Sequence, residues 1–348
     1  MTILKNKWLQ LLLIPVSMLY SLVMILRNFC YDHQFIMKST RIQGCKIISI
    51  GNISVGGTGK TPTVEYLAAL LLAQNKKPAI LSRGYRRKSR GLQVVSDGET
   101  IISDCERSGD EPYLLARNLP GTPVVVEGDR IKGAKFIVEN FSPDYIILDD
   151  GFQHRRIQRD LDIVLIDASQ DIGNGLTIPA GWLREPLSGL RRADIIILTR
   201  VDQSHDPGRL AGWLRTYLGV ATIQSIHQPV CLKSLSSLET VDIDLLAAER
   251  VIIFSGIGNP QSFRSTVTAL GAIITDEIFF PDHHTYSSSD ITNLTSRANQ
   301  HDARWILTTE KDAIKLQHMS GLSTKFLFLK IVLKIVTDED KIIEMLKL

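Results

Sequence analysis

The sequence is poor in cysteine, and its few cysteines stand far apart. None of the four forms a CxxC motif or shares the spacing of a Cys/His metal site. This pattern argues against a disulfide framework and against a structural zinc ion, and it fits a reducing cytosol. The four residues are Cys30, Cys45, Cys105 and Cys231.

A strong excess of charge is also lacking. The formal net charge of +3 is too small to indicate a nucleic-acid partner, and we expect none. A local cluster of basic residues at 83–90 can still meet phosphate or an acidic membrane face. The 348 residues are 44% hydrophobic and 22% charged, without a repeat or a low-complexity tract. This length and composition predict a globular protein of two α/β domains.

Residues 8–26 form an apolar run with few breaks. The run is long enough to be a transmembrane candidate, and the basic residues on both flanks give no orientation. A signal peptide is disfavoured, because no small-residue cleavage site follows and the nucleotide motif described below needs cytosolic ATP. Three alternatives stay open: a helix that spans the membrane, a helix that lies in the interface, and a core helix of the first domain. The interrupting residues are Gln10, Pro15, Ser17 and Ser21, and the flanking ones are Lys5, Lys7 and Arg27.

Short apolar segments rich in β-branched residues alternate with helical stretches after residue 45. Alternation of this kind predicts an α/β fold in which helices cover both faces of a parallel sheet. Ligands of such sheets bind at the carboxyl ends of the strands. The predicted strands are Lys46–Ile50, Pro78–Leu81, Pro123–Val126, Tyr145–Leu148, Ile163–Ile166 and Ile195–Leu198.

The first predicted strand runs into a glycine-rich loop, and an amphipathic helix follows over Pro62–Leu72. The glycines let backbone amides face phosphate oxygens, and the helix N-terminus adds its dipole. Lys60 can then reach the β/γ-phosphates, and Thr61 can ligate magnesium. The loop is a variant of G-x-x-x-x-G-K-[ST], because a serine stands where the first glycine belongs. The candidate nucleotide-binding residues are Ser54, Val55, Gly56, Gly57, Thr58, Gly59, Lys60 and Thr61, and Lys60 is also a catalytic candidate.

Two adjacent carboxylates, Asp149 and Asp150, follow the predicted strand Tyr145–Leu148. A second strand of a phosphate-binding-loop enzyme places a metal-binding carboxylate at this point, and Mg²⁺ prefers carboxylate and phosphate oxygens. Either residue can hold the ion, directly or through water. The sequence therefore predicts ATP and Mg²⁺ as cofactors.

The pattern also divides the chain. It loosens between Gly219 and Glu249, and a second αβ unit begins with the strand Val251–Phe254 and continues to a strand at Trp305–Leu307. We expect a membrane-associated helix over 1–27, a core domain like that of the P-loop NTPases over 28–218, a linker over 219–250, and a smaller α/β domain over 251–348.

Three further motifs have an ordinary structural explanation when taken alone. Asp110 in Gly109–Pro112 fits a helix cap, Asp282–His284 fits a surface turn, and Thr309–Asp312 fits a second cap.

Other charged motifs allow two interpretations. Arg83, which follows a predicted strand, and the pair Arg184–Glu185 fit either surface ion pairs or a phosphate and metal shell. Thr199–Asp202 occupies the position where guanine-reading enzymes carry Asn-Lys-x-Asp. Its first two residues differ from that pattern, so we do not infer GTP.

Taken in order, these motifs resemble those of one family, the tetraacyldisaccharide 4'-kinases of lipid A biosynthesis in Gram-negative bacteria. The resemblance spans nearly the whole chain, and it rests on the ordered set rather than on any single motif. The set comprises the N-terminal apolar helix, Gly51–Pro62, Ser82–Tyr85, Gly109–Pro112, Asp149–His154, Pro179–Gly181, Leu183–Pro186, Asp282–His283 and Thr309–Asp312.

The resemblance implies transfer of the γ-phosphoryl group of ATP to the 4'-hydroxyl of tetraacyldisaccharide 1-phosphate, at the cytoplasmic face of the inner membrane. It also implies that Asp110 is the catalytic base and that His283 supports it. The residues implied near magnesium are Asp149, Asp150 and Glu185, and those implied near the phosphates or the acceptor are Arg83, His154 and Arg184.

Two functions from other classes are the alternatives. A membrane-tethered NTP hydrolase would use the same loop as a conformational switch and would need no acceptor. A non-catalytic membrane scaffold would keep the loop without turnover, but the intact Gly-Lys-Thr and Asp-Asp sequences argue against it. One site complete in one chain favours a monomer.

Overall fold

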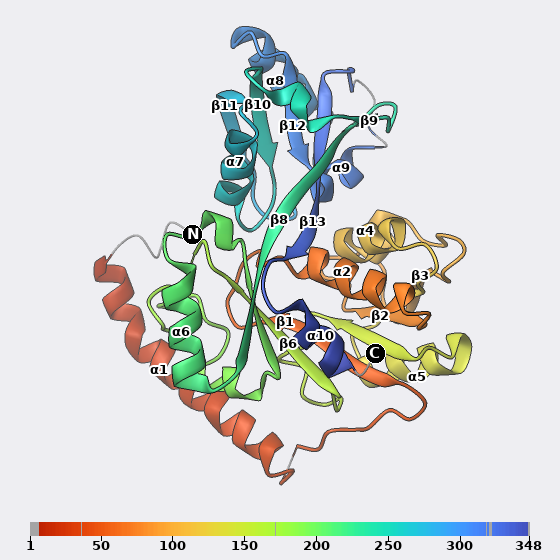
Figure 1. Ribbon diagram of the computed structural model, residues 1–348, viewed down its shortest axis with the longest axis vertical. Coiled ribbons are helices and arrows are strands. Elements are labelled where there is room, and N and C mark those ends of the chain that lie inside the picture. Colours follow the sequence, from red (N-terminus) through yellow and green to blue (C-terminus); the bar gives the residue numbers. More distant parts are fainter. Residues whose placement is uncertain (1–6, 36, 171, 318, 320–321, 347–348) are drawn as a thin grey trace.

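One large, mostly parallel β-sheet runs through the whole molecule, which has a mixed α/β fold (Figure 1). The computed structural model describes residues 7–348 apart from 36, 171, 318, 320–321 and 347–348. The lower half in Figure 1 holds the longer series of parallel strands. The parallel strands are β1 (Lys46–Asn52), β2 (Pro78–Ser82), β4 (Val124–Val126), β5 (Tyr145–Asp149), β6 (Leu161–Asp167) and β7 (Ile195–Thr199), and β3 (Gln93–Ser96) pairs antiparallel with β4 at the edge.

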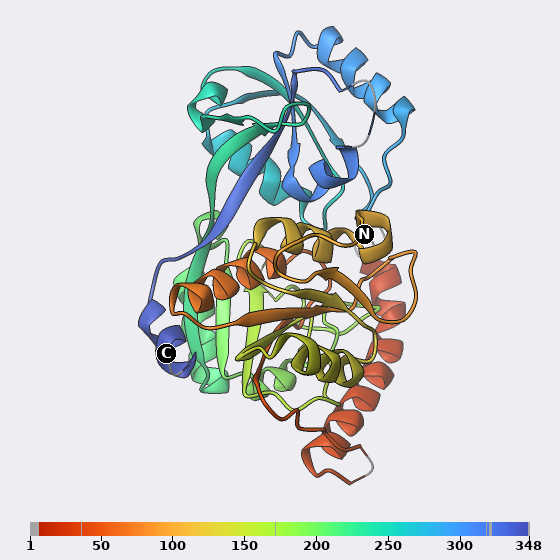
Figure 2. The same cartoon turned by 90° about the vertical axis from the view of Figure 1, so that its right-hand side faces the viewer.

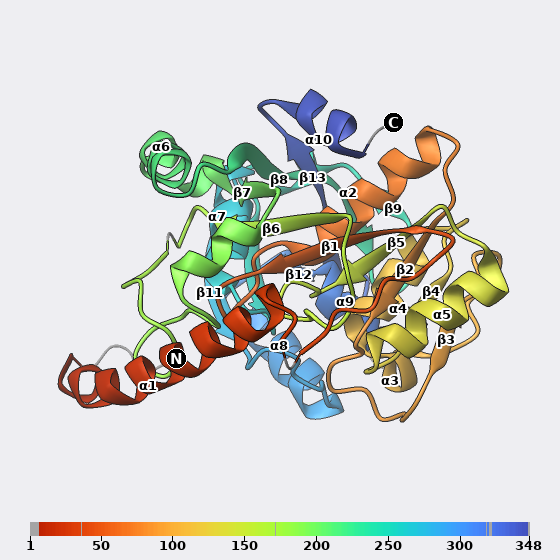
Figure 3. The same cartoon turned by 90° about the horizontal axis from the view of Figure 1, so that it is seen from below.

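The lower strands are buried on both faces because their side chains alternate between two cores. In β7, Ile195 and Ile197 face one core, whereas Ile196 and Leu198 face the other. Figure 3 shows α2 and α10 on one side of these strands, with α1 and α5 on the other. The helices of this half are α1 (Lys7–Asp32), α2 (Lys60–Ala73), α3 (Cys105–Ser108), α4 (Asp110–Asn118), α5 (Arg130–Phe141), α6 (Pro207–Leu218) and α10 (Glu339–Leu346), with short 3₁₀ helices at Leu187–Arg192 and Val201–Gln203.

Helix α1 lies along the outside of the lower half and continues past the expected end at residue 27 (Figure 2). Residues 1–6 of the expected segment lie outside the described residues. The polar residues of α1 face the protein: the Ser17 hydroxyl accepts from the Ala180 amide, and Tyr20 donates to the Arg184 carbonyl. The apolar residues face away, with Leu12 75% and Leu19 63% exposed. Of the three alternatives, the core helix is therefore wrong, because most of the apolar surface of α1 is not buried.

The upper half is a smaller αβ unit, as the second series of apolar segments predicts. Its parallel strands lie in the order β11-β10-β12-β13, and Phe254 and Phe326 meet in its core. Its elements are β9 (Thr240–Val241), a 3₁₀ helix at Ile243–Leu246, β10 (Arg250–Ser255), α7 (Pro260–Ala269), β11 (Ile273–Phe279), α8 (Ser288–Gln300), β12 (Trp305–Thr309), α9 (Glu310–Leu316) and β13 (Phe326–Ile335).

Two long strands join the halves, and the loose linker expected over 219–250 is not what the structure forms. Strand β8 (Ala221–Ser234) pairs with β7 in the lower half and then runs antiparallel to β13 into the upper half. Its polar residues hide the strand pattern, because both faces of such a connection are only partly buried. The chain then returns: Ile342 and Leu346 of α10 pack in the lower core, so the C-terminal helix belongs to the lower half.

Candidate active site

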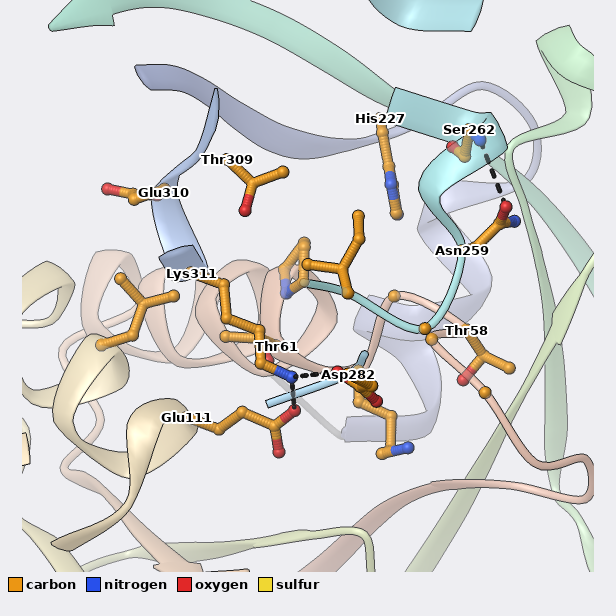
Figure 4. A pocket seen from close by; sticks show the side chains of 18 of the residues that line it. Thr58, Thr61, Glu111, His227, Asn259, Ser262, Asp282, Thr309, Glu310 and Lys311 are labelled. Carbon is orange, nitrogen blue, oxygen red and sulfur yellow. Dashed lines mark hydrogen bonds and ion pairs between the residues drawn. The ribbon is translucent and has the colours of Figure 1, made fainter. Parts of the chain in front are cut away.

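A cavity of about 530 Å³ lies between the two halves (Figure 4). The lower half contributes the glycine-rich loop after β1 and the carboxylates after β5. The upper half contributes the segments after β11 and β12. Ligand sites of α/β sheets form at the carboxyl ends of strands, and these four segments follow such ends. Its lining includes Lys60, Asp149, Asp150, Arg184, His283 and Lys311.

The glycine-rich loop turns directly into α2, whose N-terminus borders the cavity. Gly59 precedes the helix with a φ of 89°, and a side chain there would begin 2.6 Å from Nε2 of His227. Glycine is therefore required both for the turn and for the close approach. The first amides of α2 have no partner within the helix, and with the helix dipole they favour an anion in the cavity.

The sequence-predicted loop residues divide into two groups. Residues 56–61 all line the cavity. Ser54 and Val55 do not: Ser54 pairs with Leu183, and the Val55 amide donates to the carbonyl of Trp182. These two residues fix the base of the loop against the segment that carries Arg184.

The two carboxylates after β5 lie in different electrostatic surroundings. Asp150 is half-buried, which opposes its charge, but it faces Lys60 at 3.5 Å and Arg184 at 2.9 Å. These cations outweigh the burial and lower the pKa of Asp150 to about 2. Burial and the nearby charges of Glu111 and Asp150 instead raise the pKa of Asp149 to about 6. Asp149 accepts a hydrogen bond from Ser82 on Oδ2, while its buried Oδ1 has no protein donor among the described residues.

Asp110 and His283 come together although 173 positions separate them. Nδ1 of His283 lies 3.1 Å from Oδ2 of Asp110, so the histidine side chain joins the upper half to the first turn of α4. Gly109 occupies the N-cap position of α4 and Asp110 is the first helical residue, so the Asp110 carboxylate is not the helix cap. Burial opposes ionisation of Asp110, but the His283 hydrogen bond and the charge of Lys315 outweigh it and lower its pKa. His283 borders the cavity, and Asp110 contacts it from behind.

A second cross-domain contact lies beside this pair. Nζ of Lys311 lies 2.9 Å from Oε1 of Glu111 and 3.5 Å from Nε2 of His283 (Figure 4). Nε2 of His283 also lies 3.8 Å from Oδ2 of Asp282, so this nitrogen faces a cation and a carboxylate, while Nδ1 faces the Asp110 carboxylate. Asp282 completes the group at 3.5 Å from Lys311, and the Arg86 side chain donates to the Asp282 carbonyl.

Besides Ser54, Val55 and Asp110, two further sequence-predicted site residues, Glu185 and His154, do not line the cavity. Glu185 is fully buried, and both its oxygens accept protein hydrogen bonds, from Asn28 and Arg192 on Oε2 and from Gln153 on Oε1. Its position does not support the expected role as a metal ligand. His154 also does not line the cavity; burial and the nearby charges of Arg130 and other arginines lower its pKa to about 4.

The structure adds residues that the sequence argument did not select. Glu111 and Lys311 belong to motifs that fit helix caps, and Thr309 does cap α9 through the Asp312 amide. Their positions in the sequence could have indicated them as site residues. Lys311 comes just after the strand β12, and Glu111 lies in the first turn of α4. His227 sits in the polar strand β8 and points into the cavity, where burial and Arg200 hold its pKa well below the ordinary value. No local pattern marks it.

The fold and this cavity define an ATP-dependent kinase. A glycine loop with a lysine at a helix N-terminus is suited to a phosphoryl donor, and a carboxylate–histidine pair whose histidine borders the same cavity is suited to a hydroxyl acceptor. Comparison with known proteins makes the assignment particular. Residues 9–348 match the family model LpxK, Tetraacyldisaccharide-1-P 4'-kinase.

Relatives and a solved structure agree with that match. The tetraacyldisaccharide 4'-kinase of Syntrophus aciditrophicus (strain SB) is 42% identical over 350 residues, covering 97% of this chain and 93% of the relative. That of Aquifex aeolicus (strain VF5) is 42% identical over 305 residues, covering 88% and 89%. The crystal structure of LpxK from Aquifex aeolicus in complex with ATP matches with a TM-score of 0.77 and 37% identity, over 97% of this chain and 98% of that one. The chain belongs to the tetraacyldisaccharide-1-phosphate 4'-kinase family of lipid A biosynthesis.

Proposed function

We propose that the chain performs this reaction by holding the triphosphate of ATP on residues 56–61 and aligning its γ-phosphate with the 4'-hydroxyl of the lipid-linked disaccharide. The amides at the start of α2, Lys60 and Arg184 supply positive charge where the transferred phosphoryl group develops negative charge. Arg83 also lines the cavity and adds to this charge. Positioning and charge neutralisation supply most of the acceleration in such a reaction.

The residues of the cavity fit a magnesium ion. Asp149 presents an unpartnered buried oxygen, and a cation there would offset the burial and the neighbouring carboxylates that raise its pKa. Asp150 and Thr61 lie in the same cavity and are oxygen donors, which Mg²⁺ prefers. When bound, the ion would neutralise charge on the β- and γ-phosphates.

Asp110 and His283 activate the acceptor in this account. Asp110 takes the proton of the 4'-hydroxyl, and His283 positions the carboxylate through its Nδ1–H donor. The observation that carries the proposal is this pair, whose histidine lines the same cavity as Lys60 and whose two members come from opposite halves. A hydrolase that acts as a switch needs no such acceptor base. Both members belong to one chain, which supports a monomer as the working unit.

Helix α1 supports a membrane role at the cytoplasmic face of the inner membrane. Residues Gln10–Asp32 are long and apolar enough to cross a bilayer. However, polar contacts hold α1 along the protein surface, from Gln10, which donates to the Ala180 carbonyl, to Asn28, whose carbonyl accepts from Arg155, while the apolar side of the helix faces outward. We therefore assign α1 to the interface rather than to a spanning orientation, with Leu12 and Leu19 among the residues that enter the lipid. The site would then meet its lipid substrate at the membrane surface.

Transfer of labelled γ-phosphate in detergent micelles tests this proposal. Wild type with Mg²⁺ should label tetraacyldisaccharide 1-phosphate, whereas Lys60→Ala, Asp110→Ala and wild type with EDTA should not. If the wild type hydrolyses ATP without labelling the lipid, the acceptor assignment is wrong and the switch alternative replaces it.

A further inference from the structure

The segment Thr199–Asp202 occupies the position of the guanine-reading motif Asn-Lys-x-Asp. Its first two residues contact backbone carbonyls of the glycine-rich loop. The Thr199 hydroxyl donates to the carbonyl of Thr58 at 2.9 Å, and NH1 of Arg200 donates to the carbonyl of Gly57 at 2.9 Å. Thr199 is the last residue of β7 and Arg200 follows it, and both acceptors belong to residues that line the cavity. The motif therefore contacts the backbone of the loop.

These two hydrogen bonds determine the direction of two loop amides. A trans peptide is planar, with its C=O and N–H pointing in opposite directions. The carbonyls of Gly57 and Thr58 point toward the end of β7, so the N–H groups of Thr58 and Gly59 point away from it. Amides of such a loop bind phosphate only when they converge on one side.

Arg200 is held firmly enough to do this. Its φ is 56°, a left-handed conformation that is uncommon outside glycine, and its side chain is 8% exposed. NH1 lies 2.6 Å from Oδ2 of Asp167, which is 4% exposed. A buried charge pair contributes little net stability, so its value here is the placement of the guanidinium group.

The upper half joins the same group through Asn259. Its Nδ2 donates to Oδ2 of Asp167 at 2.9 Å, and its Oδ1 accepts from the Ser262 amide and caps α7 (Figure 4). The preceding residue also approaches the loop: a side chain on Gly258 would begin 2.5 Å from the Gly57 nitrogen. Both polar ends of Asn259 therefore have protein partners while its neighbour packs against the loop.

We propose that Asp167, Thr199, Arg200 and Asn259, here called the loop clamp, are positioning residues for ATP. The clamp holds the loop amides toward the phosphates and couples that orientation to the position of the upper half. This inference rests on the proposed phosphate-binding role of residues 56–61. Thr199 is fully buried and does not line the cavity, so its effect on ATP must pass through the loop.

Thr199→Val and Thr308→Val form a matched pair of variants. Each removes a buried hydroxyl that donates to a backbone carbonyl at 2.9 Å, that of Thr58 in one case and of Phe254 in the other. With the full-length protein in micelles, Thr199→Val should raise the calorimetric dissociation constant of MgATP about tenfold. Its kcat at saturating ATP and its KM for lipid should stay within about twofold. Thr308→Val should change none of these, although both variants should lower the unfolding temperature alike.

Asn259→Ser tests the coupling between the halves. Serine keeps a capping oxygen for α7 but lacks the amide that donates to Asp167. We expect about fivefold weaker MgATP binding. Combined with Thr199→Val, the loss should be smaller than the product of the two single losses, because both changes release the same loop. Combined with Thr308→Val, the two effects should multiply independently.

The possible results distinguish a failure of the loop clamp from a failure of the proposed phosphate-binding role of residues 56–61. Unchanged MgATP affinity in Thr199→Val, or an equal loss in Thr308→Val, overturns the clamp. Independent multiplication of Asn259→Ser and Thr199→Val would show that the upper half is not coupled to the loop. If the phosphate-binding role itself were wrong, Lys60→Ala would bind MgATP as tightly as the wild type.

Discussion

The two walls of the cavity are built in different ways. The lower wall, which the lower half forms, is positioned by one sheet. The glycine-rich loop follows β1, and Asp149 is the last residue of the neighbouring strand β5. The upper wall meets the lower one through side chains: His283 reaches Asp110, and Lys311 reaches Glu111. The residues proposed to bind phosphate therefore lie within one half. The Asp110–His283 pair, in contrast, forms only when both halves meet.

This difference separates two tasks of the enzyme. Variants of the lower wall should weaken both nucleotide binding and transfer. Variants of the upper wall should slow transfer and leave nucleotide affinity largely unchanged, apart from the loop clamp, which links the walls. The predictions below test that separation.

The largest effect is expected from the lower wall. Lys60→Ala removes a cation aimed at the phosphates and leaves Asp150 paired with Arg184 alone. We expect kcat/KM for ATP to fall about 1000-fold, with a parallel loss of MgATP affinity by calorimetry. The control Lys77→Ala, in the exposed turn after the same helix, should change neither. Tight MgATP binding by Lys60→Ala would contradict the role of the lower wall.

On the upper wall, His283→Asn should reduce kcat about 100-fold while MgATP affinity stays within about twofold. The carboxylate base is still present in this variant, but its orienting donor is lost. The neighbouring change His284→Asn should cost less than about threefold, because His284 pairs with Asp290 instead. A loss for His283→Asn as large as that of Asp110→Asn would transfer the base role to the histidine.

Breaking the second cross-domain contact should have a smaller effect. Lys311→Met leaves the half-buried Glu111 without its nearest cation, so we expect about tenfold slower transfer and a lower unfolding temperature. Lys88→Met removes a pair with the same 2.9 Å distance at an exposed site, and it should leave the unfolding temperature unchanged. Equal behaviour of the two variants would show that the Lys311 pair does not hold the walls together.

The smallest effect concerns stability where the walls meet. Burial raises the pKa of Glu65 from its ordinary value to about 7, opposed by the Asn118 hydrogen bond and assisted by Glu310. Because the folded pKa is the higher one, stability is lost as pH rises from about 4.5 to 7. Glu65→Gln should therefore stabilise the protein by about 2 kcal/mol at pH 8 and by nothing at pH 4.5. Denaturant unfolding at both pH values measures this, and equal shifts would contradict the buried charge.

The parallel strands of the lower half could be predicted from the sequence, because each is a short apolar run buried on both faces. The parallel strand β11 of the upper half is only partly buried and forms no such run. The expected strand Tyr145–Leu148 differs from β5 by one residue. Strand β8 could not be predicted in this way, since its polar residues give no clear alternation. In α1, Gln10 and Ser17 count only as interruptions of an apolar run until their partners at residue 180 are known.

The candidate site was predictable to the extent that its residues follow strands of the lower half. Lys60, Asp149 and Asp150 are such residues, and motif and position together select them. The partnership of Asp110 with His283 has no local signal, because it depends on how the two halves pack. Resemblance alone implied it, and resemblance also implied the metal role for Glu185 that the buried position of that residue does not support.

The separation of the two tasks is tested most directly by Asp110→Asn, which is nearly isosteric and removes the proposed base. Its kcat for transfer to the lipid and its MgATP dissociation constant should be measured side by side with the wild type. We predict that kcat falls about 1000-fold while the dissociation constant stays within about twofold. Normal turnover from pH 6 to pH 9, or a loss of MgATP binding as large as the loss of turnover, would contradict the account.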